Sequence, residues 1–557
     1  MADGVQGPVT AARLIVEALE RNGVERVFCV PGESYLALLD ALHDSSIAVT
    51  LCRQEGGAAM AAEAWGKLTG RPGIVMVTRG PGATNASAGI HVGRQDSTPM
   101  IVFIGQVGRA MRGREAFQEI DFRRMFGQMA KWIEEIDSAE RVPEFVSRAF
   151  HEATAGRPGP VVLALPEDVL RQTTSAANPP PWVPVETYPG LTQMAELQKM
   201  LWRAKRPFVI VGGSRWSEMA VAALQRFAER FALPVGCSWR RQSLFDHEHP
   251  NYAGDIGVGV NPALAKRVKE ADLLLLIGGR MSEMPSSGYT LIDIPEPRQT
   301  LVHVHPGAEE LGRLYRPTLA INASPTAFAA ALEGLQPPNE IPWVGSAAAA
   351  HADYQAWSAP LANPGPVQLS RIVAWLSQRL PEDAIVASAA GNYSTWVHRF
   401  FRHRRYATQL APTSGTMGYG LPAGLAAKLK YPQRMVVVFA GDGDLQMTMQ
   451  EFITAVQAGA NIVVVVVNNG IHGTIRMHQE RAYPDRAIAT DLKNPDFAAY
   501  ARACGGHGEA VATTEDFAAT FERCVAAGKP AIIDLAFDPE AITPSRTLSE
   551  IRGTGRR

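Results

Sequence analysis

Short runs of β-branched and other apolar residues alternate along this 557-residue chain with stretches whose apolar positions recur at helical spacing. Apolar strands flanked by amphipathic helices are typical of doubly wound parallel sheets, which are covered on both faces. We therefore predict an α/β fold. The expected strands are 26–30, 73–77, 100–104 and 161–165, then 208–211, 273–277 and 301–304, and finally 385–387, 435–439, 462–467 and 531–535.

Two changes of composition divide the sequence into three blocks. The first is a proline-rich stretch at 172–190, and the second runs from 336 to 366 and contains four consecutive alanines. Such stretches are typical of linkers and connecting segments. We predict three doubly wound domains, at 1–175, 190–340 and 365–545, followed by a tail at 546–557, and we expect the first and last to be similar folds.

Composition excludes several classes of function. A hydrophobic content of 46% is enough to fill the cores of a large globular protein, and a formal net charge of −1 offers no attraction for nucleic acid or anionic membranes. No apolar run approaches the roughly 20 residues needed to cross a bilayer. The first residues lack the basic and apolar regions of a secretory signal, so we expect a cytoplasmic protein.

Cysteine and histidine patterns do not indicate a metal or redox motif. The five cysteines are scattered and never form a Cys-x-x-Cys pair, and the 13 histidines form no His-Glu-x-x-His arrangement. We interpret the cysteines as small core residues.

The most informative stretch is Gly441-Asp442-Gly443-Asp444, which follows an apolar strand. A helix predicted over 445–458 and a second apolar strand over 461–467 then lead to Asn468-Asn469. These elements form one βαβ unit, in which Asp442 and Asn469 follow neighbouring parallel strands and face the same crevice. Carboxylate and amide oxygens suit Mg²⁺, and the two glycines allow a diphosphate to approach the backbone at a helix start.

This pattern resembles the diphosphate and metal signature of thiamine-diphosphate (ThDP) enzymes. The resemblance implies ThDP and Mg²⁺ as cofactors, with the metal bound by Asp442, Asn469 and the main-chain carbonyl of Ile471. It also identifies the three domains as pyrimidine-binding, central nucleotide-binding-like and diphosphate-binding. Asp444 departs from the pattern, because many relatives have a small residue there. An extra carboxylate beside a diphosphate must point away or be paired with a cation.

Other motifs resemble further parts of the same family's site. Glu55, in the segment 53–63, matches the glutamate that hydrogen-bonds a pyrimidine nitrogen and so enables loss of the cofactor's C2 proton. The loop 414–423 resembles the one that bends the cofactor, with Met417 as the wedge between its rings and the Gly415 carbonyl as an acceptor. The remaining match lies where the family holds the diphosphate from the preceding strand, at Gly391, Asn392 and Tyr393.

The resemblance is closest to the acetolactate (acetohydroxyacid) synthase-like group. Segments 79–85, 104–107 and 115–119 support it. Gln118 is expected to contact a bound keto acid or, alternatively, to tie down its own loop. Glu33, in the segment 30–40, matches the decarboxylase version of this turn. It is either a second acid–base group or an ordinary surface carboxylate.

The reaction class implied is addition of a 2-keto acid to the cofactor, loss of CO₂, and protonation or transfer to a second carbonyl. Three readings remain open. The first is an acetolactate synthase-like carboligase. The second is a non-ligating 2-keto-acid decarboxylase or a 2-hydroxyacyl-CoA lyase, for which Arg240, Arg241, Arg280 and the basic tail Arg552 to Arg557 would meet nucleotide phosphates. The third is a non-catalytic paralogue, which retention of Glu55, Asp442, Asn469 and Met417 disfavours.

Two more features bear on ligands and assembly. Glycine turns at 211–215 and 277–280 fit an FAD or another adenine nucleotide in the central domain, but His303-Val304-His305 stands where relatives have an acidic pair, which argues against FAD. Arg476 is a candidate for binding a carboxylate. The resemblance further implies a homodimer or homotetramer, with the cofactor between subunits and a small keto acid or acyl compound as substrate.

Overall fold

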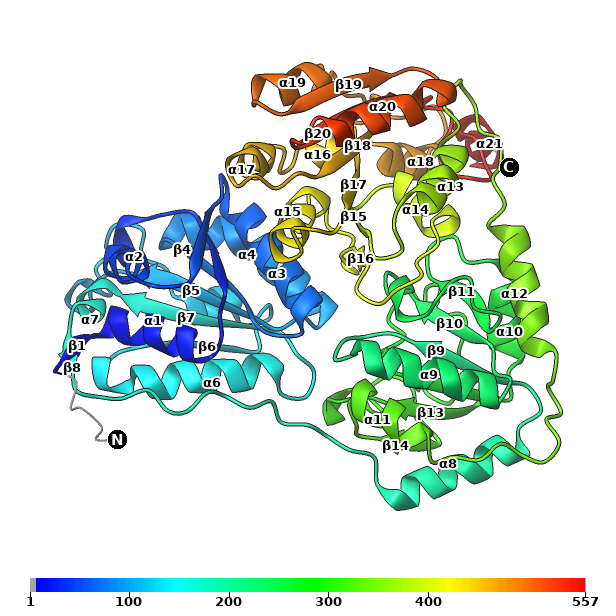
Figure 1. The fold of residues 1–557 in the computed structure, drawn as a ribbon, viewed down its shortest axis with the longest axis horizontal. Helices are drawn as coiled ribbons and strands as arrows, with labels where there is room; N and C mark the ends of the chain where they lie inside the picture. Colours follow the sequence, from blue (N-terminus) through cyan, green and yellow to red (C-terminus); the bar gives the residue numbers. More distant parts are fainter. Residues whose placement is uncertain (1–6, 556–557) are drawn as a thin grey trace. The chain divides into compact units, whose positions relative to one another are not determined.

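The computed structural model describes residues 7–555, which form an α/β fold built on three six-stranded parallel sheets (Figure 1). A short antiparallel pair, β1 (Val9–Thr10) with β8 (Thr173–Thr174), forms a separate two-stranded sheet. By compactness the chain divides into two units. One reaches residue 185 and includes 425–430 and 448–458, and the other contains the rest. The three-domain boundaries given above stay a prediction.

The N-terminal sheet has the strand order β3-β2-β4-β5-β7-β6. From β2 the chain passes first to β3 on one side and then to β4 on the other, so the topological switch point lies between β2 and β4. The strands are β2 (Arg26–Cys29), β3 (Ala48–Leu51), β4 (Gly73–Val77), β5 (Met100–Gln106), β6 (Trp132–Glu135) and β7 (Pro160–Pro166). The helices are α1 (Ala11–Arg21), α2 (Leu36–His43), α3 (Glu55–Thr69), α4 (Gly80–Asp96), α5 (Phe122–Phe126), α6 (Val142–Thr154) and α7 (Glu167–Leu170).

The central sheet has the different order β11-β10-β9-β12-β13-β14, with its switch point between β9 and β12. Its strands are β9 (Pro207–Val211), β10 (Val235–Ser238), β11 (Tyr252–Ile256), β12 (Leu273–Ile277), β13 (Thr300–Val304) and β14 (Leu319–Ile321). Its helices are α8 (Leu191–Arg203), α9 (Glu218–Arg230), α10 (Pro262–Glu270), α11 (Pro325–Leu332) and α12 (Ser346–Trp357).

The C-terminal sheet, ordered β16-β15-β17-β18-β20-β19, repeats the topology of the N-terminal sheet, as expected from the sequence. Its switch point lies between β15 and β17. The strands are β15 (Ile385–Ser388), β16 (Gln409–Leu410), β17 (Val436–Gly441), β18 (Val463–Asn468), β19 (His507–Val511) and β20 (Ala531–Ala536). The helices are α13 (Leu369–Arg379), α14 (Tyr393–Phe400), α15 (Gly420–Lys430), α16 (Asp442–Leu445), α17 (Glu451–Gln457), α18 (Gly473–Ala482), α19 (Phe497–Ala503), α20 (Thr514–Ala526) and α21 (Leu548–Gly555).

The single helix predicted over 445–458 is wrong. The structure has α16 ending at Leu445 and α17 beginning at Glu451, because tighter hydrogen bonds, from Met447 N–H to the Asp444 carbonyl and from Glu451 N–H to the Thr448 carbonyl, interrupt the helical spacing. The predicted tail contains the helix α21. Within residues 7–555, no helix is long and apolar enough to span a bilayer.

Candidate active site

A cavity of about 220 Å³ lies at the carboxyl edge of the C-terminal sheet. Strands β15, β17 and β18 all end beside this cavity. It therefore lies at the switch point between β15 and β17, where open α/β sheets bind ligands. Every site residue predicted in the C-terminal block lines it: Gly391, Asn392, Tyr393, Gly415, Met417, Gly441, Asp442, Gly443, Asp444, Asn469 and Ile471.

Two helices begin in the wall of this cavity. Asn392 precedes α14 and His472 precedes α18, and both residues line the space. Helix N-termini present unpaired N–H groups and partial positive charge, which favours an anion such as a diphosphate. Gly443 keeps the wall open, since a Cβ added there would lie 2.6 Å from the His472 ring.

Asp442 is held in place by hydrogen bonds to one of its two oxygens. Its Oδ2 accepts from Gly470 N–H at 2.9 Å and from the Asn494 side chain at 2.7 Å. Asn494 also donates to Asn468 Oδ1 at 2.8 Å. Burial raises the pKa of Asp442, although these hydrogen bonds oppose the shift. Asp442 therefore presents an oriented carboxylate to the cavity.

The other expected metal ligands follow β18. Asn469 Oδ1 accepts a 3.3 Å hydrogen bond from Ile471 N–H. Ile471 forms an isolated antiparallel bridge with Asp491. The hydrogen bonds of this bridge are made by the residues on either side of Ile471: His472 N–H donates to the Thr490 carbonyl, and the Gly470 carbonyl accepts from Leu492 N–H. In such a bridge the central residue turns its own carbonyl away from the partner strand. Asp442, Asn469 and the Ile471 carbonyl thus form a set of hard oxygen donors that suits Mg²⁺.

Asp444 is buried, and both of its oxygens accept hydrogen bonds. Oδ2 accepts from the Tyr393 hydroxyl and Oδ1 from Gly418 N–H, each at 2.6 Å. Burial raises the pKa of Asp444 to about 6, while these hydrogen bonds and the charge of Arg240 oppose the rise. Because Gly418 follows Met417, Asp444 joins the end of β17 to the loop that carries the expected wedge residue.

Tyr393 and Asn392 are already engaged with protein groups. The Tyr393 hydroxyl donates to Asp444 and accepts from Ala389 N–H at 3.0 Å. The Asn392 amide nitrogen donates to the Ile542 carbonyl at 2.9 Å, and its oxygen accepts from the Thr474 hydroxyl at 2.9 Å. Both side chains brace the cavity wall.

The predicted catalytic residues of the N-terminal block gather around the first turn of α4. Glu55 opens α3 with only 9% of its surface exposed, and its Oε2 accepts from the Asn85 side chain at 2.9 Å. A Cβ added to Gly82 would lie 3.4 Å from its Oε1. Gln118 packs its backbone on the same turn, because a Cβ on Gly80 would lie 2.8 Å from the Gln118 carbonyl oxygen.

Glu119, rather than Gln118, ties down the loop. Its carboxylate accepts from Gly113 N–H at 2.9 Å and from Ala116 N–H at 3.1 Å. The side-chain amide of Gln118 makes no hydrogen bond to any residue between 7 and 555, and its backbone has a φ of 63°. Contact of Gln118 with a keto acid stays a prediction.

Glu33 pairs with a buried arginine that the sequence did not single out. Arg79 Nη2 lies 2.8 Å from Glu33 Oε1, and Arg79 Nη1 lies 3.6 Å from Glu167 Oε2. The three residues follow β2, β4 and β7, so they share the carboxyl edge of the N-terminal sheet.

Glu451 is a second residue that the sequence pattern did not reveal. Within the compact unit that holds the N-terminal sheet, its buried carboxylate accepts from Arg53 N–H at 3.0 Å and from Gln54 N–H at 2.9 Å. Gln54 in turn caps α3 by accepting from Gly57 N–H. Glu451 thereby fixes the start of the helix that carries Glu55.

At the central switch point, several polar atoms of the two glycine turns make hydrogen bonds within the chain. The N–H groups of Gly212 and Gly278 donate to the carbonyls of Ile277 and Val304. The carbonyl of Gly212 accepts from Trp216 Nε1 at 2.8 Å, that of Gly213 from Arg241 Nε at 3.0 Å, and that of Gly279 lies 2.9 Å from His303 Nε2.

The two histidines in place of the acidic pair are buried. Burial lowers the pKa of His303 and lowers that of His305 to about 4, so both are neutral near pH 7. They supply neither the carboxylate that would bind a ribose nor a cation for a phosphate.

Arg476 and, in the basic tail, Arg552 are paired within the protein, while Arg556 and Arg557 lie outside the described residues. Arg476 Nε lies 3.1 Å from Glu480 Oε1, and its Nη1 lies 3.1 Å from Asp491 Oδ1. Arg552 of α21 binds Glu480 through two nitrogens at 2.8 and 2.9 Å. Arg240, another candidate for phosphate binding, donates to the Pro412 carbonyl.

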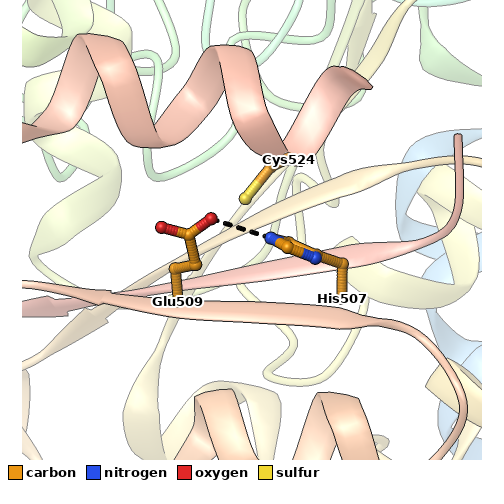
Figure 2. A group of neighbouring side chains, drawn as sticks. All are labelled: His507, Glu509 and Cys524. Carbon is orange, nitrogen blue, oxygen red and sulfur yellow. Dashed lines mark hydrogen bonds and ion pairs between the residues drawn. The ribbon is translucent and has the colours of Figure 1, made fainter. Parts of the chain in front are cut away.

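A separate group of possible metal ligands lies on the outer strand β19 and helix α20. Figure 2 shows His507 Nε2 bound to Glu509 Oε1, at 2.8 Å, with the Cys524 sulfur beside them. Arg523 also binds Glu509, and burial raises the pKa of the Cys524 thiol to about 12. With its carboxylate paired and its thiol protonated, the group joins α20 to β19 as an ion-pair cluster.

Comparison with known proteins gives the family. Three family models match: the N-terminal TPP-binding domain over residues 9–125, the central domain over 194–332 and the C-terminal TPP-binding domain over 389–535, all described as thiamine pyrophosphate enzyme domains. The chain is 30% identical to the acetolactate synthase isozyme 2 large subunit of Escherichia coli K12, over 95% of this chain and 96% of that protein. The chain belongs to the thiamine pyrophosphate enzyme family.

Other relatives of this thiamine pyrophosphate enzyme have related names. The acetolactate synthase large subunit of Lactococcus lactis is 30% identical, over 90% of this chain and 88% of that one. The probable acetolactate synthase large subunit of Methanocaldococcus jannaschii is 29% identical, over 96% and 93%. The predicted fold, ThDP as cofactor and membership of the acetolactate synthase-like group are confirmed.

Proposed function

We propose that this ThDP enzyme decarboxylates a 2-keto acid and transfers the remaining acyl unit to a second carbonyl compound, as the names of its relatives suggest for them. The observation that carries the proposal is the meeting of all the predicted cofactor residues in one cavity at the C-terminal switch point. Bound ThDP supplies the nucleophilic carbon at which decarboxylation and transfer take place.

The donor set of this cavity fits the cofactor's diphosphate and a divalent metal. Asp442, Asn469 and the carbonyl of Ile471 would bind Mg²⁺, and the N-terminal ends of α14 and α18 would face the phosphate oxygens. Gly441 and Gly443 would allow close approach. Met417 would pack against the rings, and the Gly415 carbonyl would accept from the cofactor's amino group.

Glu55 would exchange a proton with the pyrimidine ring of the cofactor. Asn85 holds Oε2 of Glu55, and Gly82 leaves room beside Oε1, so one oxygen is oriented while the other is free to face a ligand. Glu451 keeps this helix start in position. Gln118 would hydrogen-bond the keto acid, and Glu33 would act as a second proton donor or acceptor.

The decisive experiment measures hydrogen–deuterium exchange at C2 of bound ThDP. Glu55→Gln keeps the size of the side chain and removes its acid–base function, so exchange is expected to slow by about a hundredfold or more while ThDP still binds. Glu196→Gln, a partly exposed carboxylate on α8, serves as the matched control. Unchanged exchange in Glu55→Gln would remove this residue from the mechanism.

Product analysis then separates the reaction classes. Wild-type enzyme with ThDP and Mg²⁺ is given pyruvate, phenylpyruvate or formyl-CoA, each with and without an added carbonyl acceptor. Hydroxy keto acids or hydroxy ketones would support carboligation. Aldehyde alone would indicate a non-ligating decarboxylase, and turnover of formyl-CoA a lyase.

We propose further that the enzyme acts without FAD. The hydrogen bonds that the N–H groups of Gly212 and Gly278 donate within the chain support this proposal, as do the neutral histidines at the ribose position. A homodimer or homotetramer in the cytoplasm remains our proposal for the active form, supported by the family resemblance. Light scattering of the purified protein would test its assembly.

A further inference from the structure

Arg79 has an environment unlike that of an ordinary surface arginine. It immediately precedes α4 and is only 7% exposed. Its Nε is buried and has no hydrogen-bond partner among residues 7–555. A buried guanidinium with an unused donor is costly unless an anion satisfies it.

The two carboxylates around Arg79 differ in how firmly they are held. The Glu33 side chain, at 2.8 Å, is 66% exposed, whereas that of Glu167, at 3.6 Å, is 31% exposed. An exposed partner contributes little net stability and is readily exchanged. If the carboxylate of a ligand took the place of the Glu33 side chain beside Arg79, the net charge around Arg79 would not change.

The position of Arg79 also points to a ligand. Glu33 and Arg79 follow β2 and β4, so they flank the switch point of the N-terminal sheet, which has the same topology as the sheet whose switch point holds the cofactor cavity. The first turn of α4, next to Arg79, also contacts Glu55 and Gln118. The centroid of the exposed Phe117 ring lies 5.7 Å from the guanidinium carbon.

We propose that Arg79 binds the carboxylate of the acceptor substrate and thereby selects a 2-keto acid over an uncharged aldehyde as acceptor. The inference rests on the proposed carboligase function. An arginine fork matches a carboxylate through two parallel hydrogen bonds. The donor's carboxylate is the poorer candidate, because pairing it with a cation would stabilise the charge that disappears when CO₂ is lost and so would oppose the reaction.

Glu33 then has a defined place in the selection. It occupies Arg79 when no substrate is bound and is released when the acceptor's carboxylate arrives, which leaves it free for the proton transfer proposed above. Glu33→Gln, which weakens this competition, is expected to lower the KM for a keto-acid acceptor. Arg79→Met, which removes the cation and keeps an apolar side chain, is expected to raise it.

The test is a competition between two acceptors on the enzyme loaded with ThDP and Mg²⁺. Pyruvate serves as donor, and a keto acid and benzaldehyde compete as acceptors at fixed concentrations. In Arg79→Met the ratio of hydroxy keto acid to hydroxy ketone is expected to fall about tenfold or more, while C2 exchange of ThDP stays within about twofold of wild type. Arg109→Met, at the same sheet edge and paired with Asp168, is the control and should keep the wild-type ratio.

Two further measurements keep the test independent of the folding of one variant. Arg79→Lys retains a cation without the planar fork and should give an intermediate ratio. Propionate should inhibit wild type competitively against the keto-acid acceptor, and the isosteric propionamide should not. Equal inhibition by both, or an unchanged product ratio in Arg79→Met with exchange intact, would overturn the assignment.

The outcome also separates this inference from the proposed function. Wild-type enzyme that makes no ligation product from any keto acid tested would refute carboligation itself, and the role of Arg79 with it. Wild-type ligation together with an equal loss of both products in Arg79→Met would refute only the selective role.

Discussion

The hydroxyl of Tyr393 lies 2.6 Å from Oδ2 of Asp444, and this contact accounts for a carboxylate beside a diphosphate site. With Gly418 N–H on its other oxygen, Asp444 has donors for both oxygens and is 3% exposed. The departure from the family pattern thus has a structural role, because it connects α14, the end of β17 and the Met417 loop.

Tyr393→Phe is expected to weaken ThDP binding while preserving the packing of the ring. The change leaves the buried Asp444 carboxylate with one hydrogen-bond donor fewer, which costs about 1 kcal/mol or more. The affinity for ThDP is therefore expected to fall roughly fivefold to tenfold. The rate at saturating cofactor should stay within about twofold, since Tyr393 has no assigned part in the chemistry. Calorimetric titration with ThDP and Mg²⁺ measures the affinity.

The matched control is Tyr315→Phe, which removes a hydroxyl that donates to the Met281 carbonyl at 3.0 Å. Tyr315 does not line the cavity. An equal loss of affinity in both variants would show that the effect is one of general stability rather than of the contact with Asp444.

Asn494 is expected to tune the proposed metal site through Asp442. Asn494→Ala removes the 2.7 Å hydrogen bond that orients the carboxylate. Loss of such a supporting contact typically weakens metal binding about 10- to 100-fold. Titration of ThDP binding against Mg²⁺ should therefore shift to higher metal concentration, with little change once metal is saturating. Asn322→Ala, which loses two side-chain hydrogen bonds beside the central sheet, should leave the Mg²⁺ dependence of ThDP binding unchanged.

All the strands that the sequence revealed lie in the interior of the sheets, and the interior strand β10 (Val235–Ser238) was missed. Central strands such as β12 (Leu273–Ile277) are covered on both faces and appear as continuous apolar runs. The strands that the pattern did not predict include every edge strand: β3, β6, β11, β14, β16 and β19. Edge strands such as β6 (Trp132–Glu135) carry polar residues because one side of the strand has no neighbour.

The parts of the candidate site that could be predicted are those in which a short segment supplies both the turn and the functional side chain. Asp442 and Gly443 lie in one turn, and their strand context places Asn469 beside them. Arg79 and Asn494 were not predictable, because each acts through a partner distant in sequence, Glu33 and Asp442 respectively. Only the folded sheet edges bring these pairs together.

Purified enzyme is expected to contain no flavin and to bind neither FAD nor ADP. The N–H groups of Gly212 and Gly278 at the central switch point already donate to main-chain carbonyls, and the ribose position has neutral His305 in place of a carboxylate. Absorbance, mass analysis of released small molecules and calorimetry test this, with ThDP binding in the same sample as the positive control. Stoichiometric flavin released from the protein would contradict the expectation.

The last prediction concerns the C-terminal helix, which supports the cavity wall. Leu548 and Ile551 of α21 pack with Met477 and Ile542, and Ile542 lines the cavity. Glu480, only 1% exposed, joins α21 to α18 by binding Arg552. Hydrogen bonds from Arg552, supported by Asp485 N–H and Arg476, lower the pKa of Glu480 from 4.5 to about 2.

A carboxyl group whose pKa is lowered by folding stabilises the folded state above its ordinary pKa and ceases to do so as pH falls through its folded value. For Glu480 this contribution is about 3 kcal/mol at neutral pH, and it is lost between roughly pH 4.5 and 2. Glu480→Gln should therefore reduce the hydrogen-exchange protection of α21 amides strongly at pH 7 and hardly at all near pH 2. Protection of α20 serves as the internal control, and an equal difference at both pH values would show that the ionised carboxylate does not hold the helix.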